Sequence, residues 1–264
     1  MTQEEKLILS PLVYGYSFGT SKWGAFPVDN LSNVEWNGNL LNSLVMEQSL
    51  RSIMYGLIKT HSAGTSNFDD FVKGKGKGII GLLHGPPGSG KTLTAEAIAE
   101  TGHMPLYAVS TGALGHEPDN IHSELMQILR LATHWGAVLL LDEADVFLAK
   151  RTMTNLKQNA IVSVFLRELE YYEGILLLTT NQIDRIDEAF LSRTHFCHKY
   201  LNLDAEARRA IWLNFIQDAR ERKNMTVKID SESIERLANM PLNGRQIKNA
   251  MSIAIKLTAV TVTD

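Results

Sequence analysis

The chain has 264 residues, an apolar fraction of 44% and a formal net charge of −3, which suit a folded core of one large domain, or a large and a small one, and argue against a protein that mainly wraps nucleic acid. Cys197 is the single cysteine, so an internal disulfide and a cysteine-based zinc site are excluded. The acidic N-terminus and the short apolar runs predict a soluble intracellular protein of the cytoplasm or nucleus, without a signal peptide or membrane segment.

The first part of the chain lacks a clear periodicity. Residues 11–38 are rich in aromatic residues, glycine and asparagine, and we interpret them as an irregular or strand-like lead-in. Leu40 to Lys59 follow with the apolar spacing of one helix. The basic glycine turn Lys73–Gly78 then leads into the first core strand, and it is either solvated or close to phosphates.

Strand and helix patterns alternate from residue 79 onwards. The strand candidates are apolar without polar alternation, and amphipathic helices separate them, which predicts a parallel sheet covered on both faces. Strands are expected at 79–84, 105–109, 137–142 and 175–180, with a weaker one at 197–202, and helices at 91–101, 118–135 and 154–171.

From Asp204 the pattern is helical only. The fold class we expect is therefore α/β, a three-layer α/β/α sandwich with a parallel sheet, followed by a small all-α lid domain. The expected division is a lead-in at 1–38, a core at 39–202 and a helical lid at 203–264, the lid containing helices at 204–222, 231–239 and 243–258.

One glycine-rich segment predicts the ligand. Gly85 to Thr92 have the sequence Gly-Pro-Pro-Gly-Ser-Gly-Lys-Thr, between an apolar strand and a helix, a context that favours a P-loop over a chance glycine-lysine turn. Its backbone N–H groups and the helix dipole suit a phosphate chain. Lys91 is placed to reach the outer phosphates and Thr92 to ligate Mg²⁺. We expect a P-loop NTPase with ATP and Mg²⁺ as cofactors, the nucleotide-binding residues being Gly85, Pro86, Pro87, Gly88, Ser89, Gly90, Lys91, Thr92 and Leu93.

Two further strand ends carry polar side chains. The strand from Val138 ends in Asp142 and Glu143, and ligands collect at the carboxyl ends of parallel strands. Asp142 is placed to hold Mg²⁺ through water and Glu143 to polarise an attacking water, whereas alone the pair would be read as solvated acids. Asn181 ends the next strand and is placed to orient the same water, although a turn-forming asparagine is common there.

Together these motifs resemble the AAA+ ATPases, and residues 137–200 resemble a group of fungal members in particular. The P-loop resembles a Walker A motif, Leu139–Glu143 a Walker B motif, and Asn181 a sensor-1 residue. Ile183–Arg193 resembles the segment that carries the arginine finger, and Leu242–Asn249 the sensor-2 helix of the lid.

The resemblance, which runs from about residue 40 to 258, implies roles for two arginines. Arg193 would act on the γ-phosphate bound by a neighbouring subunit, the alternative being an ordinary surface salt bridge. Arg245 would bind the nucleotide from the lid, the alternative being a solvated arginine at a helix start. The implied activity is Mg²⁺-dependent ATP hydrolysis in a ring oligomer, a hexamer by resemblance, that remodels an unidentified protein client, with Lys91, Glu143, Asn181 and Arg193 as the catalytic set.

Several features depart from the family pattern. Arg193 stands alone, where many relatives have a second arginine nearby. The loop Ser110–Asn120 lacks the aromatic residue that protein-threading relatives place in the pore, and His116 is either a substitute or a solvated loop histidine. A fourth lid helix is not expected from Thr258–Asp264. The fungal members usually carry long N-terminal regions, for which this chain has little room, so the sequence is either a bare ATPase module or a fragment.

Two other functions remain open at this point. A nucleic-acid-linked loader shares the same core, but it needs a basic face, and only residues 73–77, Arg208–Arg209 and Arg220–Lys223 supply one. Nucleic acid is therefore not the partner we expect. A nucleotide-gated scaffold without turnover would result if the subunits do not assemble.

Overall fold

The computed structural model of the chain describes residues 10–62, 78–114, 118–152, 155–222, 227 and 229–260. The lysines of the predicted basic turn at 73–77 lie outside these residues, as do His116 and Lys223. None of the helices in the described ranges combines the length and the apolar character that a membrane crossing requires.

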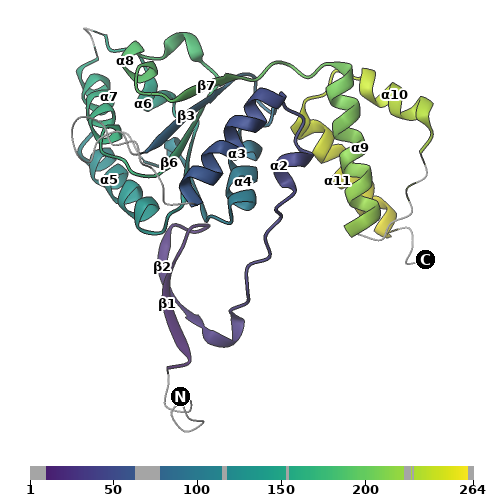
Figure 1. Cartoon of the computed structure of the whole chain (residues 1–264), viewed down its shortest axis with the longest axis horizontal. Coiled ribbons are helices and arrows are strands. Elements are labelled where there is room, and N and C mark those ends of the chain that lie inside the picture. The colour runs from purple at the N-terminus through teal and green to yellow at the C-terminus, as the bar shows by residue number, and fades with distance from the viewer. Residues whose placement is uncertain are drawn as a thin grey trace.

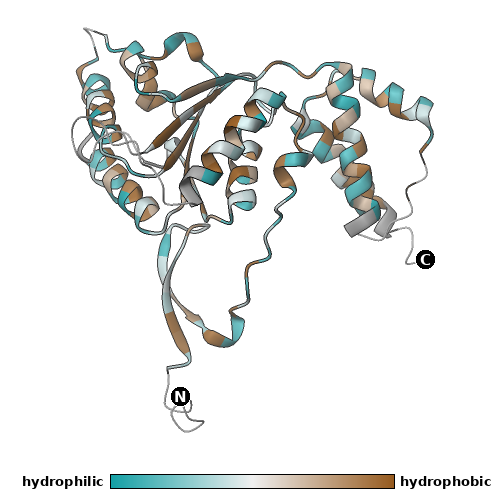
Figure 2. Ribbon diagram, viewed as in Figure 1, coloured by the Kyte–Doolittle hydropathy of each residue, from teal (hydrophilic) through white to brown (hydrophobic). Residues whose placement is uncertain are grey.

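A parallel sheet of five strands, in the order β4-β5-β6-β3-β7, forms the centre of the α/β part of the molecule (Figure 1). The three inner strands β5, β6 and β3 are apolar on both faces because helices cover both, and the inner strands of the sheet are brown in Figure 2. The strands are β3 (Ile79–His84), β4 (Leu106–Ser110), β5 (Val138–Asp142), β6 (Ile175–Thr180) and β7 (Phe196–Lys199).

Alternate residues of the central strands face two separate cores. Leu139 and Leu141 of β5 pack with α5 (Pro118–His134) and α7 (Leu156–Leu169). Val138 and Leu140 of the same strand pack on the opposite side, with α3 (Gln48–Ser62) and α4 (Lys91–Gly102). The three-layer arrangement is the one predicted, and it brings the carboxyl ends of all five strands to one edge.

Three helices follow the sheet and form the lid. They are α9 (Ala205–Arg222), α10 (Ser231–Asn239) and α11 (Gly244–Val260), and α9 packs against both of the others. Trp212 and Ile216 of α9 and Ile234 of α10 supply buried side chains to this small core. The predicted fold class, an α/β sandwich with an all-α lid, is therefore confirmed, although α11 continues to Val260, past the predicted end at residue 258.

The lead-in contains a β-hairpin. Strands β1 (Leu12–Ser17) and β2 (Lys22–Pro27) pair antiparallel, with Tyr16 opposite Trp23. Tyr16 stacks on Trp135, with ring centroids 5.4 Å apart, and its hydroxyl lies 3.0 Å from that of Tyr107. The strand-like interpretation holds for the hairpin, whereas residues 31–37 are irregular, and the hairpin docks at the β4 edge of the sheet.

The single helix expected at Leu40–Lys59 is wrong. The chain forms a short helix, α2 (Leu40–Ser43), and then turns before α3 begins at Gln48. Leu44 is extended, with ψ of 136°, and its carbonyl accepts a hydrogen bond of 2.8 Å from the Arg51 guanidinium. The break lets Leu41 and Leu50 both enter the core against α4.

Candidate active site

The loop after β3 needs glycine at three positions for two reasons. Gly85, Gly88 and Gly90 have φ of 143°, 72° and 106°, values that side chains disfavour. A Cβ on Gly85 would lie 2.3 Å from the Tyr200 carbonyl oxygen, and one on Gly88 would lie 2.8 Å from the Asn243 side chain. The backbone therefore curls tightly into α4, as a phosphate-binding loop requires.

Lys91, at the first position of α4, lies over this loop. Its ammonium donates hydrogen bonds of 2.8 Å to the carbonyl oxygens of Gly85 and Pro86 and to Oδ1 of Asn181. The side chain is buried, and burial holds the pKa of Lys91 below its ordinary value, with Asp142 opposing the shift and Arg245 adding to it. The structure thus brings Lys91 and Asn181, predicted from separate motifs, into direct contact.

Thr92 and Asp142 lie side by side at the same edge. The Thr92 hydroxyl is 3.4 Å from each carboxylate oxygen of Asp142. Hydroxyl and carboxylate oxygens are hard donors, and Mg²⁺ in phosphate sites is held by one or two such groups together with phosphate oxygens. The donor set therefore fits Mg²⁺, as the sequence predicts for these two residues.

Glu143 occupies a left-handed turn directly after β5. Its φ is 56°, and its exposed side chain lies at the strand edge. The backbone is fixed from both sides, because its N–H donates to the Thr179 hydroxyl over 3.0 Å and its carbonyl accepts from the Thr111 hydroxyl. A strained backbone held in this way fixes the direction of the side chain.

Thr179 is a site residue that the sequence interpretation missed. Its hydroxyl donates to Asp142 and accepts from the Glu143 N–H, so one side chain positions both acids. The available signal is a polar residue that stays buried, 1% exposed, at the end of the apolar run 175–178. Tyr200, also missed, contacts Gly85 and shares a 2.6 Å hydrogen bond with Thr94 of α4.

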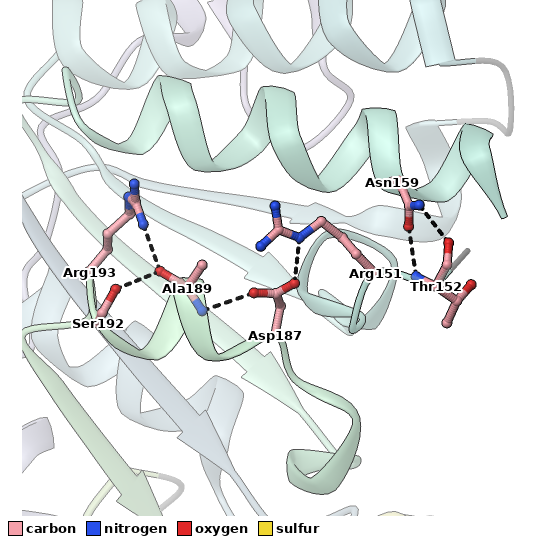
Figure 3. A network of polar contacts seen from close by, with 7 residues as sticks. All are labelled: Arg151, Thr152, Asn159, Asp187, Ala189, Ser192 and Arg193. Atoms are coloured by element: carbon pink, nitrogen blue, oxygen red, sulfur yellow. Dashed lines mark hydrogen bonds and ion pairs between the residues drawn. The ribbon is translucent and has the colours of Figure 1, made fainter. Parts of the chain in front are cut away.

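Arg193 is engaged within its own chain. It follows α8 (Glu188–Leu191), and its two terminal nitrogens donate to the Ala189 carbonyl over 2.8 Å and to the Glu170 carboxylate over 2.7 Å. Figure 3 shows Arg193 at one end of a row of polar contacts that runs through Ala189 and Asp187 to Arg151. The salt bridge that the sequence left open as an alternative is thus present, and a role on a neighbouring subunit stays a prediction.

The lid meets the P-loop at the start of α11. The Gly244 N–H donates to the Gly88 carbonyl over 3.0 Å. Asn243 caps the helix, since its side chain accepts from the Gln246 N–H and its own N–H donates to the Gln246 side chain. Arg245 follows directly in the first turn of α11, and its charge contributes to lowering the pKa of Lys91.

Two protein-family models match most of the chain. Residues 81–201 match the ATPase family associated with various cellular activities (AAA), and residues 203–264 match a fungal AAA+ ATPase lid domain. The chain belongs to the AAA family of ATPases. The P-loop thus lies in the segment matched by the AAA model, and the lid helices lie in the segment matched by the lid model.

Relatives from bacteria and archaea agree with this membership. The chain is 28% identical over 193 residues to the ATP-dependent zinc metalloprotease FtsH of Malacoplasma penetrans, covering 69% of this chain and 23% of that protein. It is 32% identical over 127 residues to proteasome-activating nucleotidase 1 of Halobacterium salinarum, covering 44% of this chain and 31% of the relative. The AAA chain thus spans less than a third of the length of these two relatives.

A solved structure supports the fold. The AAA domain of FIGL-1, in complex with ADP, aligns with a TM-score of 0.63 and 18% identity, covering 83% of this chain and 73% of that one. At this identity the likeness concerns the AAA fold only.

Proposed function

We propose that this chain hydrolyses ATP by in-line attack of water and that it works in a ring of subunits to remodel a protein client. The observation that carries the proposal is the contact between Lys91 and Asn181. It joins the P-loop to the end of β6 next to the paired acids on β5, so that the phosphate-binding and water-orienting groups share one edge of the sheet.

Each part of the reaction is assigned to residues of this chain. The loop amides and Lys91 hold the phosphates, and Thr92 and Asp142 hold Mg²⁺, which when bound neutralises charge on the phosphate oxygens. Glu143 accepts a proton from the attacking water, and Asn181 orients that water. Thr179 keeps the two acids in register through its hydrogen bonds to both.

The two arginines extend the site beyond the loop. Arg245 contacts the nucleotide from the lid, and the contact of the neighbouring Gly244 with Gly88 supports this assignment. Arg193 acts on the nucleotide of the neighbouring subunit, which requires it to exchange Glu170 for a phosphate. A ring, and a hexamer in particular, supplies that neighbour.

The names of the relatives support a protein client. One is an ATP-dependent metalloprotease and another a proteasome-activating nucleotidase, and both names refer to work on proteins.

Phosphate release and sedimentation of the Glu143→Gln variant test the two parts of the proposal, hydrolysis and assembly. This variant retains ATP because the group that accepts the proton from water is missing, and general-base removal costs about 10²- to 10⁴-fold in turnover. We expect it to sediment as a ring with ATP and as smaller species with ADP. Glu206→Gln, at the exposed start of α9, is the control and keeps wild-type turnover.

Two results would contradict the proposal. Unchanged phosphate release by Glu143→Gln would remove the hydrolysis mechanism. A monomer at every ATP concentration would leave Arg193 without a neighbour to serve, and the chain would then act as a nucleotide-gated scaffold. Stimulation of turnover by duplex DNA would instead favour the loader.

A further inference from the structure

Two branches of the chain leave the nucleotide edge and meet again at α8. One runs from β5 through α6 (Asp145–Leu148) to Arg151, and the other runs from β6 to Asp187. They are joined where they start, because the Thr179 carbonyl accepts from the Ala144 N–H over 2.9 Å and the Thr180 hydroxyl donates to Asp145. The groups proposed to bind Mg²⁺ and water therefore begin both branches.

The branches are joined again at their far ends by backbone pairing. Ala149 and Ile186 form an antiparallel bridge. On either side of it, the Lys150 N–H donates to the Arg185 carbonyl and the Asp187 N–H to the Leu148 carbonyl, each over 2.7 Å. Leu148 and Ile186 are buried beneath the bridge. This short two-stranded unit is therefore held by backbone hydrogen bonds and by its own buried side chains.

Asp187 connects this unit to α8 through its two carboxylate oxygens. Oδ2 accepts from Nε of Arg151 over 2.8 Å, and Oδ1 accepts from the Ala189 N–H over 2.9 Å, which caps the helix (Figure 3). The Ala189 carbonyl then accepts from Arg193. One continuous row of contacts thus runs from Arg151 to Arg193.

The environment of Asp187 favours the charged carboxylate that pairs with the Arg151 guanidinium. The residue is only 7% exposed, and burial by itself raises the pKa of its carboxyl. The hydrogen bonds from Arg151 and the Ala189 N–H outweigh burial, so that the pKa lies below its ordinary value. Removing Arg151 would leave the Asp187 carboxylate without its counter-charge, and removing Asp187 would leave the Ala189 N–H without its acceptor.

We infer that Asp187, clamped by Arg151, is a positioning residue that holds α8 so that Arg193 can act on the neighbouring subunit. The inference rests on the proposed function of Arg193. Loss of the clamp leaves the chain's own site able to bind ATP, but α8 no longer holds Arg193 in the orientation that serves the neighbour. The defect therefore acts between subunits.

A mixed-subunit ATPase assay distinguishes this role from local damage. Asp187→Asn keeps an oxygen that can cap α8 and removes the charge that pairs with Arg151. Alone, it is expected to bind ATP within about twofold of wild type and to lose about 10- to 100-fold in kcat, as displaced catalytic groups do. Excess Glu143→Gln subunits have an intact α8 but no turnover of their own. Adding them should restore most of the lost turnover, expressed per Asp187→Asn subunit.

Three further variants complete the design. Arg193→Ala should show the same loss and the same rescue. Arg151→Lys keeps the positive charge without the Nε geometry, and it should show a smaller loss with the same rescue, which provides a second test if Asp187→Asn folds poorly. Glu235→Gln breaks the exposed 2.7 Å pair with Arg209 in the lid and should retain wild-type turnover.

The outcomes separate the two proposals. If Arg193→Ala is not rescued by Glu143→Gln subunits, the action of Arg193 on a neighbour is wrong, and this inference is overturned with it. If Arg193→Ala is rescued while the clamp variants keep wild-type turnover, or lose turnover without rescue, the inference alone is overturned. Rescue of both classes supports it.

Discussion

The Lys91 ammonium lies 2.8 Å from the side-chain oxygen of Asn181, and this contact links the first turn of α4 to the end of β6. The same ammonium binds two carbonyls of the P-loop. Lys91 thus connects the phosphate-binding loop to the end of β6. Changes at Asn181 should therefore alter nucleotide binding as well as turnover.

Replacing Asn181 with aspartate should weaken ATP binding more than replacing it with alanine. A carboxylate at hydrogen-bond distance from Lys91 competes with phosphate for the ammonium, and hydrogen bonds to charged groups contribute about 1.5–3 kcal/mol, roughly a tenfold change in affinity or more. Calorimetric titration with a non-hydrolysed ATP analogue measures this difference. Asn120→Asp, in the first turn of α5, adds the same charge elsewhere as a control. Equal affinities for the two Asn181 variants would contradict the expectation.

Thr179→Val should lower turnover although the side chain keeps its shape. The change removes the hydroxyl that donates to Asp142 and leaves the Glu143 N–H without its acceptor. Groups that orient metal ligands typically matter about 10- to 100-fold in activity or metal affinity, so we expect a lower kcat and a higher Mg²⁺ requirement. Thr179→Ser should recover most of the activity. Thr133→Val, at an exposed position of α5, is the matched control, and a Mg²⁺ profile unchanged in Thr179→Val would argue against the positioning role.

Gly88→Ala should disturb both the P-loop and the lid. The position has φ of 72°, and the added Cβ would lie 2.8 Å from the Asn243 side chain, so strain of about 1–3 kcal/mol is expected. Urea unfolding and nucleotide affinity report it. Asn243→Ala removes the contact and also the cap of α11, so the comparison is made in that background, where Gly88→Ala should cost less than in wild type because only the φ strain remains. Gly38→Ala, with no atom within 4 Å of its added Cβ, should be neutral.

Lys91→Met should change the pH dependence of stability and abolish ATP binding. Burial lowers the pKa of Lys91 below 10.5, so the unfolded chain binds more protons than the folded one between the folded pKa and 10.5. Stability therefore rises with pH through that interval, and the lysine costs stability below it. The rise of the wild-type unfolding midpoint through that interval should be absent from Lys91→Met, in which this group does not titrate. The same rise in both proteins would oppose this account.

The core strands and the P-loop could be predicted because their signals are local. An apolar run followed by Gly85–Thr92 specifies a strand, a turn and a helix without reference to the rest of the chain. The structure gives β3 the predicted bounds. Asn181 and the paired acids could be assigned to one edge for a similar reason, since parallel strands align their carboxyl ends.

The rest depends on contacts between distant segments. The break at Leu44 has no glycine or proline to announce it, and it is stabilised by Arg51 and by two leucines that reach the same core. The hairpin depends on Tyr107 and Trp135, far away in sequence. Thr179 acquires its role only because β5 and β6 are neighbours, and the chain order alone does not state that.

The bonds of Tyr200 determine where the molecule is able to bend. Its N–H donates to the His84 carbonyl and its hydroxyl lies 2.6 Å from Thr94, so the residue belongs mechanically to the sheet and α4. Leu203 and Asp204 belong to the lid, through hydrogen bonds to Arg208 and to the Ala207 N–H. A hinge between the two bodies is thereby confined to Leu201 and Asn202, and any swing of the lid about it stretches the bond between Gly244 and Gly88.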